Sequence, residues 1–302
     1  MKIHYQIVAL TTSSLLALSV CIAADKPKPT VHVRVNIAHQ GVPFAAPCNT
    51  LAAVREAVKA GCDGCECDVR RSADGVVILS HDRHPQHIMG GAEGSDKMFF
   101  DQMSYKQIRQ FDAGGWKGEQ FKGEKIPTLD EYLKLLKGTT CYPVIEIKGG
   151  WQTGIEADII KCLRENDMVD VSTIIAFGAN DIQEILRLEP KICVGWLYGY
   201  DPKERGGTAF EQEENAEWLA DILIQRCREI GIAIVIPNDA WLSPKLVKLL
   251  NEADIHVWTY TVNNEAAMRR YLDWGVVGIL TDKPDILAKI LEERKKIPSG
   301  NL

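Results

Sequence analysis

Short apolar runs alternate with amphipathic segments along most of the chain. The apolar runs are bounded by polar or turn-forming residues and predict buried β-strands over 33–38, 64–69, 144–147, 173–177, 192–197, 233–236, 256–260 and 277–280. Between them, apolar positions recur every three to four residues, which predicts helices over 50–60, 129–136, 154–164, 181–188, 212–229, 243–251, 264–272 and 284–293. Successive strand–helix units of this kind, with strands apolar on both faces, predict an α/β fold of the (β/α)8 TIM barrel type.

One segment departs from this alternation. Only a turn fits between Val69 and Val76, so residues 76–80 are expected to return antiparallel, as a β-hairpin on the second strand. The next helix begins only after a segment at about 83–127, which holds several glycines and a short helical pattern near 104–111. An insertion of this length at the catalytic end of a barrel is more often functional than idle.

The length fits two small domains or one large α/β barrel, and the regular alternation of strands and helices favours one barrel domain, which we place at residues 33–298. The chain has 302 residues, of which 46% are hydrophobic and 25% charged, as in ordinary globular proteins. Its net charge of -6 and pI of about 5.7 argue against general nucleic-acid binding, for which a basic surface is expected. We therefore expect no nucleic acid as a partner, while the sequence leaves the oligomeric state open.

Residues 1–24 have the pattern of a secretory signal peptide. Lys2 is followed by an apolar run from Ile7 to Ile22 that ends at two alanines. Residues 25–32, in which lysine and proline alternate at 26–29, are interpreted as a linker. Export to the periplasm or to the exterior is therefore predicted, with no stable membrane span after cleavage; a retained N-terminal anchor is the alternative.

Nine cysteines are present, and eight would remain after removal of residues 1–24. Export would permit disulfides, but most of these cysteines lie in or beside apolar runs, which favours buried free thiols. A zinc site at Cys62, Cys65 and Cys67 is an alternative, although no second pair of Cys or His residues at suitable spacing accompanies it.

Two carboxylates lie on one face of the strand predicted at 64–69. Side chains alternate along a strand, so Glu66 and Asp68 point to one face while Cys65 and Cys67 point to the other. Close carboxylates repel each other unless a cation lies between them, and oxygen ligands suit a hard divalent ion such as Mg2+ or Ca2+. Glu146, on the next barrel strand, supplies a third carboxylate at the same end of the barrel.

Two histidines at strand ends could move protons near neutral pH. His39 ends the first predicted strand and His81 ends the hairpin, so they could act as general acid and general base across a bound substrate. Lys148, two residues after Glu146, adds a positive charge for an anionic substrate. Trp258 is either a wall of the substrate pocket or a plug of the barrel. Together these groups predict metal-assisted hydrolysis in which the cation holds a phosphate oxygen.

Several short motifs are spread along the predicted barrel. They are AHQG at 38–41, NTLAA at 49–53, ECDV at 66–69, HD at 81–82, FDAG at 111–114, IPTL at 126–129, EIK at 146–148, WT at 258–259 and GILTDKP at 278–284. In this order and spacing they resemble the glycerophosphodiester phosphodiesterase family over about residues 36–287. The resemblance implies a barrel with a hairpin and an inserted segment, metal ligands at Glu66, Asp68 and Glu146, and an acid–base pair at His39 and His81. It also implies that one divalent cation, usually Mg2+ or Ca2+, assists hydrolysis of a glycerophosphodiester to glycerol 3-phosphate and an alcohol.

Two positions depart from the family pattern. The family usually has Arg at the position of Gln40 and Glu at the position of Cys48, and that Arg would contact phosphate. Losing both leaves the local charge sum unchanged, whereas losing one partner of a buried ion pair costs about 3–5 kcal/mol. Gln40 then remains as a candidate substrate-binding residue, and Arg83, close after His81, is a candidate replacement for the missing Arg.

Three functions agree with these observations. The first is an exported, metal-dependent phosphodiesterase, and the second is a relative that binds a phosphodiester without turnover. The third is a lipid-directed phosphodiesterase of the same superfamily, which would need an exposed apolar patch near the pocket. The first is favoured because a complete set of candidate groups is present, namely His39, Glu66, Asp68, His81 and Glu146.

Overall fold

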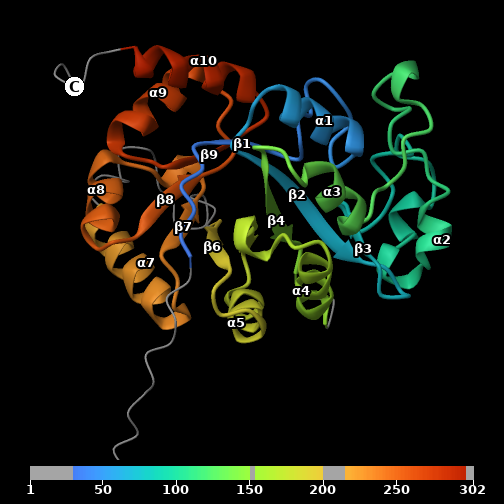
Figure 1. Cartoon of the computed structure of the whole chain (residues 1–302), viewed down its shortest axis with the longest axis horizontal. Helices are drawn as coiled ribbons and strands as arrows, with labels where there is room; N and C mark the ends of the chain where they lie inside the picture. Colours follow the sequence, from blue (N-terminus) through green and yellow to red (C-terminus); the bar gives the residue numbers. More distant parts are fainter. Residues whose placement is uncertain (1–29, 150–153, 200–214, 297–302) are drawn as a thin grey trace, which may run out of the picture.

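The strands of the protein close into a barrel. In the computed structural model, which describes residues 30–149, 154–199 and 215–296, parallel strands pair in the order β1, β9, β8, β7, β6, β5, β4, β2, and β1 also pairs with β2. Figure 1 shows the strands at the centre and the helices around them. The predicted TIM barrel is confirmed, with strands β1 (Asn36–Ala38), β2 (Gly64–Arg71), β4 (Tyr142–Ile147), β5 (Thr173–Ala176), β6 (Cys193–Tyr198), β7 (Ile234–Pro237), β8 (His256–Thr259) and β9 (Gly278–Thr281).

The hairpin on the second strand is confirmed as well. Strand β3 (Val77–Leu79) pairs antiparallel with β2 and places Leu79 opposite Val69. The insertion that follows lies outside the ring of helices, at the right of Figure 1, and has a small apolar core of its own around Phe100 and Ile108. It consists of short elements, namely η1 (Ser95–Lys97), η2 (Phe100–Gln102), α2 (Tyr105–Ile108) and η3 (Glu119–Phe121).

Several of the outer helices begin at capping side chains that the sequence offers. Thr50, Thr128 and Ser243 each accept a hydrogen bond from the first turn of the helix that follows, and Thr128 with Glu131 forms a capping box. The helices are α1 (Leu51–Lys59), α3 (Leu129–Leu136), α4 (Ile155–Glu165), α5 (Ala179–Leu188), α7 (Ala216–Ile230), α8 (Pro244–Glu252), α9 (Glu265–Trp274) and α10 (Pro284–Lys295), with the short turns η4 (Val169–Val171) and η6 (Asp239–Trp241).

Two apolar layers hold the barrel together. Side chains that alternate along each strand fill either the barrel interior, where Ile37, Ile175 and Leu280 meet, or the space between the barrel and its helices. Cys65 and Cys67 are buried in that outer layer, and every cysteine in the described residues is a free thiol, as predicted. These cysteines therefore act as small packing groups.

The predictions for the N-terminus fall on residues whose structure is not described. The signal peptide at 1–24 lies wholly outside the described residues, as does most of the linker at 25–32. Within the described residues, none of the helices combines the length and the apolar character needed to cross a bilayer.

Candidate metal-dependent active site

Three carboxylates meet at the carboxyl end of the barrel because β2 and β4 are neighbours in register. Asp68 pairs with Glu146 across the two strands, and Glu66 lies two residues earlier on the same face of β2. Oxygen atoms of the three side chains lie within 4.8 Å of one another, and all three residues are buried. No other group of His, Cys, Asp and Glu within the described residues meets this criterion, so the alternative zinc site at Cys62, Cys65 and Cys67 is not formed.

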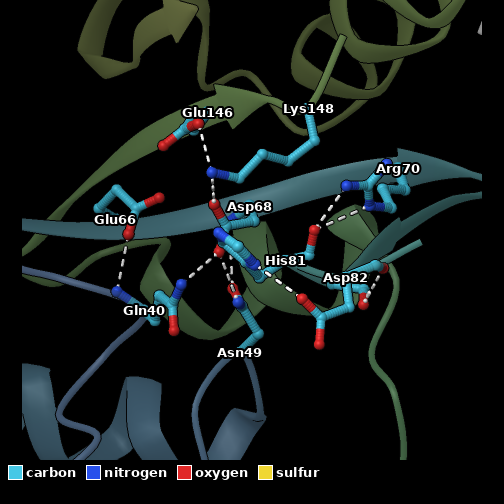
Figure 2. A network of polar contacts seen from close by, with 10 residues as sticks. Gln40, Asn49, Glu66, Asp68, Arg70, His81, Asp82, Glu146 and Lys148 are labelled. Atoms are coloured by element: carbon cyan, nitrogen blue, oxygen red, sulfur yellow. Dashed lines mark hydrogen bonds and ion pairs between the residues drawn. The ribbon is translucent and has the colours of Figure 1, made fainter. Parts of the chain in front are cut away.

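Lys148 reaches into this carboxylate cluster, and Figure 2 shows its side chain between Glu146 and Asp68. Its Nζ lies 2.9 Å from Asp68 Oδ1 and also pairs with Glu146. Three carboxylates and one ammonium leave two uncompensated negative charges. Glu66 Oε1 is buried and accepts no hydrogen bond from any described residue. A buried oxygen without a partner, in a cluster of hard oxygen donors, fits a divalent cation such as Mg2+ or Ca2+.

The pKa values of these groups reflect crowding of like charges. Burial, together with the negative charge of Asp68, raises the pKa of Glu66 well above its usual range, and the same causes raise the pKa of Glu146. Although burial opposes ionisation of Asp68 too, the ammonium of Lys148 holds the pKa of that carboxyl below its ordinary value. The cluster is therefore under electrostatic strain that a bound cation would relieve.

The loop between β1 and α1 holds Asp68 in place. Asp68 Oδ2 accepts hydrogen bonds of 2.7 Å from both Gln40 Nε2 and Asn49 Nδ2, and the Asp68 backbone N–H donates to Asn49 Oδ1 at 3.0 Å. The backbone N–H of Gln40 donates to Glu66 Oε2 at 2.7 Å. Gln40, predicted to bind substrate, thus contacts two of the three carboxylates. Asn49 was not predicted as a site residue, and only its place in the NTLAA motif pointed to it.

His39 lies at the end of β1, beside the carboxylates, and its ring is held by Asp282. His39 Nδ1 lies 2.7 Å from Asp282 Oδ1, and Asn263 donates to the other carboxylate oxygen at 2.6 Å. Burial favours the neutral imidazole, but the hydrogen bond to Asp282 and the charge of Glu66 outweigh it and raise the pKa of His39 to about 9. Asp282 was visible in the sequence only as a polar residue after the last strand.

His81 lies after the hairpin strand and is exposed on one side. Its Nδ1 lies 2.9 Å from Asp82 Oδ1, so a carboxylate orients this ring as well. Arg70, which follows Asp68 on the same face of β2, donates through Nε and Nη2 to the backbone carbonyl of His81, at 2.9 and 2.6 Å (Figure 2). Arg70 therefore ties the loop that carries His81 to the strand that carries the carboxylates, a role that the sequence did not reveal.

Two residues predicted to bind substrate, Trp258 and Arg83, contact other side chains of the protein. Trp258 is 0% exposed and packs in the barrel interior, where an inward-facing side chain of β8 meets those of neighbouring strands. A fully buried ring offers no surface to a substrate, so Trp258 is a plug of the barrel and its assignment to the substrate pocket is corrected.

Arg83, the other predicted substrate-binding residue, makes a bidentate ion pair with Asp101, at 3.0 and 2.7 Å, and stacks over Phe99. Its role toward phosphate stays a prediction.

A cavity of about 680 Å³ opens beside the carboxylates. Arg70 and Lys148 line it on the side of the carboxylate cluster, and Phe177 and Asp181 line it from the end of β5 and the start of α5. The site therefore combines a carboxylate cluster, two histidines held by carboxylates, and an adjoining cavity with cationic side chains. Such a set suits displacement at an anionic centre that a cation neutralises.

Comparison with known proteins supports this chemistry. Residues 39–286 match the model of the glycerophosphoryl diester phosphodiesterase family. The chain is 29% identical over 259 residues to a glycerophosphodiester phosphodiesterase of Caldanaerobacter subterraneus subsp. tengcongensis, covering 85% of this chain and 97% of that protein. It is 25% identical over 304 residues to a glycerophosphodiester phosphodiesterase of Bacillus subtilis, covering 94% and 97%.

Solved structures share the fold. A phosphodiesterase of Oleispira antarctica, solved in complex with the product sn-glycerol-3-phosphate, superposes with a TM-score of 0.72 at 22% identity, covering 86% of this chain and 97% of that one. A second structure, of a protein from Silicibacter pomeroyi, superposes with a TM-score of 0.73 at 24% identity, covering 89% of this chain and 96% of that one.

Proposed function

Because this chain belongs to the glycerophosphoryl diester phosphodiesterase family, a family of phosphoric diester hydrolases, we propose that it hydrolyses a glycerophosphodiester to glycerol 3-phosphate and an alcohol. The observation that carries the proposal is the complete catalytic set at one end of the barrel. Glu66, Asp68 and Glu146 cluster there, and His39 and His81 each have a carboxylate partner. A barrel that only bound its ligand would not need this set.

The carboxylates are the groups that would hold the metal, one Mg2+ or Ca2+ ion. When bound, such an ion supplies positive charge to a phosphate oxygen and neutralises the charge that develops there. Asn49 and Gln40 fix the orientation of Asp68, which leaves the second oxygen of that carboxylate toward Lys148 and the interior of the site. Lys148 then binds the anionic substrate beside the carboxylates.

The two histidines divide the proton transfers. His39 has a pKa raised to about 9 by Asp282 and Glu66 despite its burial, so it is a proton donor at neutral pH and suits protonation of the departing alcohol oxygen. His81, oriented by Asp82, accepts the proton of the attacking hydroxyl group. This assignment holds whether the attacking group is water or the neighbouring hydroxyl of the glycerol, which would form a cyclic phosphate first.

The proposal extends to where the enzyme works. Residues 1–24 have the charged start, apolar run and small-residue end of a signal peptide, which supports export to the periplasm or the exterior. N-terminal sequencing of the protein purified from the culture medium or from the periplasm tests this point. A mature protein that still begins at Met1 would contradict it.

The activity is tested by following release of glycerol 3-phosphate from glycerophosphocholine and glycerophosphoglycerol. Wild type should be active with Mg2+ or Ca2+, inactive after EDTA, and active again when the ion is restored. His39→Ala and Glu66→Gln should be inactive, whereas the exposed variant Glu93→Gln should match wild type. Absence of metal-dependent turnover on every glycerophosphodiester, in protein with an intact fold, would favour the non-catalytic alternative. Turnover only on intact phospholipid would favour the lipid-directed one.

A further inference from the structure

The mouth of the barrel is divided into an ionisable half and an aromatic half. Inward-facing positions at the carboxyl ends of β1, β2, β4 and β9 carry His39, Asp68, Glu146 and Asp282. The corresponding position after β5 carries Phe177, two residues beyond the interior residue Ile175. The position after β8 carries Tyr260, two residues beyond Trp258.

The aromatic half is a built feature, because a glycine makes room for it. The rings of Phe177 and Tyr260 meet edge to face, with centroids 5.9 Å apart and an interplanar angle of 86°. Gly199 follows β6 between them, and a Cβ added there would lie 2.6 Å from the Phe177 ring and 2.8 Å from Tyr260 Oη. Phe177 nevertheless remains 45% exposed, so one side of its ring is open to a ligand.

The exposed ring shares a cavity with two cationic side chains that lie close to the carboxylate cluster. Phe177 lines the cavity of about 680 Å³ that also contains Arg70 and Lys148. A phosphodiester whose phosphate lies beside Lys148 can therefore extend its alcohol portion along Phe177. Arg226 also borders this cavity, but its guanidinium is paired with Glu229 at 2.9 Å.

A pair of carboxyl groups lies beyond the ring. Asp181 and Glu156 belong to the first turns of α5 and α4, which lie side by side in Figure 1, and their side chains share a hydrogen bond. Asp181 Oδ2 fits into a crevice between two glycines, because a Cβ at Gly149 or Gly178 would lie only 2.3 or 2.2 Å from it. The cavity is thus cationic near the metal site and aromatic and acidic away from it.

We infer that this cavity is the head-group subsite and that it selects a positively charged alkylammonium head group, of the choline or ethanolamine type, whose charge lies against Phe177 and Asp181. The inference rests on the proposed function. The phosphate of such a zwitterion matches the Arg70 and Lys148 side, and its cation matches the face of an aromatic ring and a carboxylate. A neutral polyol gains neither interaction, and an anionic head group would be repelled by Asp181 and Glu156.

The test compares kcat/KM for glycerophosphocholine, glycerophosphoethanolamine and the uncharged-head-group substrate glycerophosphoglycerol. Wild type should prefer both ammonium substrates. Phe177→Ala should lower the preference for glycerophosphocholine over glycerophosphoglycerol by about fivefold, within the range known for cation–π contacts. Phe177→Leu keeps an apolar side chain without a π face, so the same drop in this variant identifies the ring charge distribution and not bulk as the cause. Asp181→Asn should lower the preference as well, most for glycerophosphoethanolamine, whose ammonium donates hydrogen bonds.

The outcomes distinguish failure of the head-group inference from failure of the proposed phosphodiesterase activity. Turnover of all substrates without preference for an ammonium group, or unchanged ratios in both Phe177 variants, would overturn the inference and leave the phosphodiesterase activity standing. Turnover of none would overturn the proposed function itself. As a matched control, Asp221→Asn on the exposed face of α7 should leave every ratio unchanged. Calorimetry can measure binding of glycerophosphocholine to the His39→Ala protein, so this readout does not depend on turnover. Adding Phe177→Leu to that protein should weaken the binding.

Discussion

His39 Nδ1 lies 2.7 Å from Asp282 Oδ1, and this contact joins the first strand of the barrel to the last. Ala38 pairs with Thr281 where β1 meets β9, so closure of the barrel itself brings the two side chains together. A residue 243 positions away therefore orients the His39 ring and favours its charged form.

Asp282→Asn should impair the acid step more than it impairs binding. The asparagine keeps the hydrogen-bonding shape but removes the negative charge that raises the pKa of His39, so that pKa should fall from about 9. We expect kcat to drop by about 100-fold or more, with little change in KM, and the high-pH limb of the kcat profile to move to lower pH. Steady-state kinetics from pH 5 to pH 10, scanned in about half-unit steps, measures this. If the high-pH limb of the Asp282→Asn profile lay at the same pH as in wild type, His39 would not be the general acid.

The same pair predicts how the stability of the metal-free protein depends on pH. The pKa of His39 is raised in the folded state from 6.5 to about 9, so its contribution to stability is complete below about pH 6.5 and is lost as pH rises through about 9. At about 1.4 kcal/mol for each pKa unit, the contribution is at most about 3 kcal/mol. Wild type should therefore lose more free energy of unfolding than His39→Gln between about pH 6 and pH 9.5 in EDTA.

Urea unfolding at the two pH values measures this difference, because the variant carries every other titrating group of wild type. Asp221→Asn, on the exposed face of α7, serves as the control and should follow the wild-type curve. Equal losses in wild type and His39→Gln would show that the imidazole gains no charge stabilisation on folding.

The sequence predicted the fold well because strand and helix periodicities are local. It was less accurate at strand ends, which depend on pairing partners. The first strand was predicted from residue 33 but begins at Asn36, where β9 provides a partner, while Val33 is 64% exposed. In the same way, the clustered carboxylates were visible from their alternation along the strand, whereas the parts played by Asn49 and Asp282 were not, since these depend on contacts between distant elements.

Glu66→Gln should stabilise the metal-free protein while it abolishes metal binding. The pKa of Glu66 is raised by burial and by Asp68, so its ionised form is unfavourable without a cation, and a neutral amide can still accept the N–H of Gln40. In EDTA we expect the melting temperature to rise by roughly 2–4 °C. In excess Mg2+ or Ca2+, wild type should gain stability by mass action and Glu66→Gln should gain none.

Differential scanning calorimetry with and without the ion measures both effects. Glu93→Gln, at an exposed position of the insertion, is the matched control and should keep the full metal-dependent gain in stability. If the Glu66→Gln protein gained as much stability from the ion as wild type, Glu66 would not be a ligand.

The resemblance drawn from the sequence marks Gln40 and Cys48 as the place of a lost Arg–Glu pair, and it predicts that these two positions are coupled. Cys48 is half-buried, and burial with the nearby charge of Asp68 raises the pKa of its thiol to about 11, so it is neutral beside the carboxylates. Gln40 donates to Asp68 at 2.7 Å without adding charge. Cys48→Glu alone adds a fourth carboxylate and should lower the free energy of unfolding in EDTA by about 2 kcal/mol. Adding Gln40→Arg should restore at least about 1 kcal/mol of this loss.

A double-mutant cycle in urea measures the coupling directly. The matched control combines Gln40→Arg with Cys162→Glu, because Cys162 is likewise a half-buried thiol but belongs to α4 and lies beside Asn166, away from the carboxylate cluster. That pair should be additive within about 0.5 kcal/mol. Additivity in the Gln40–Cys48 cycle as well would mean that the two departures arose as independent changes and not as the joint loss of an ion pair. We expect coupling in the Gln40–Cys48 cycle and none in the control cycle. Asp68 lies next to both side chains, so a charge on either of them changes its electrostatic energy.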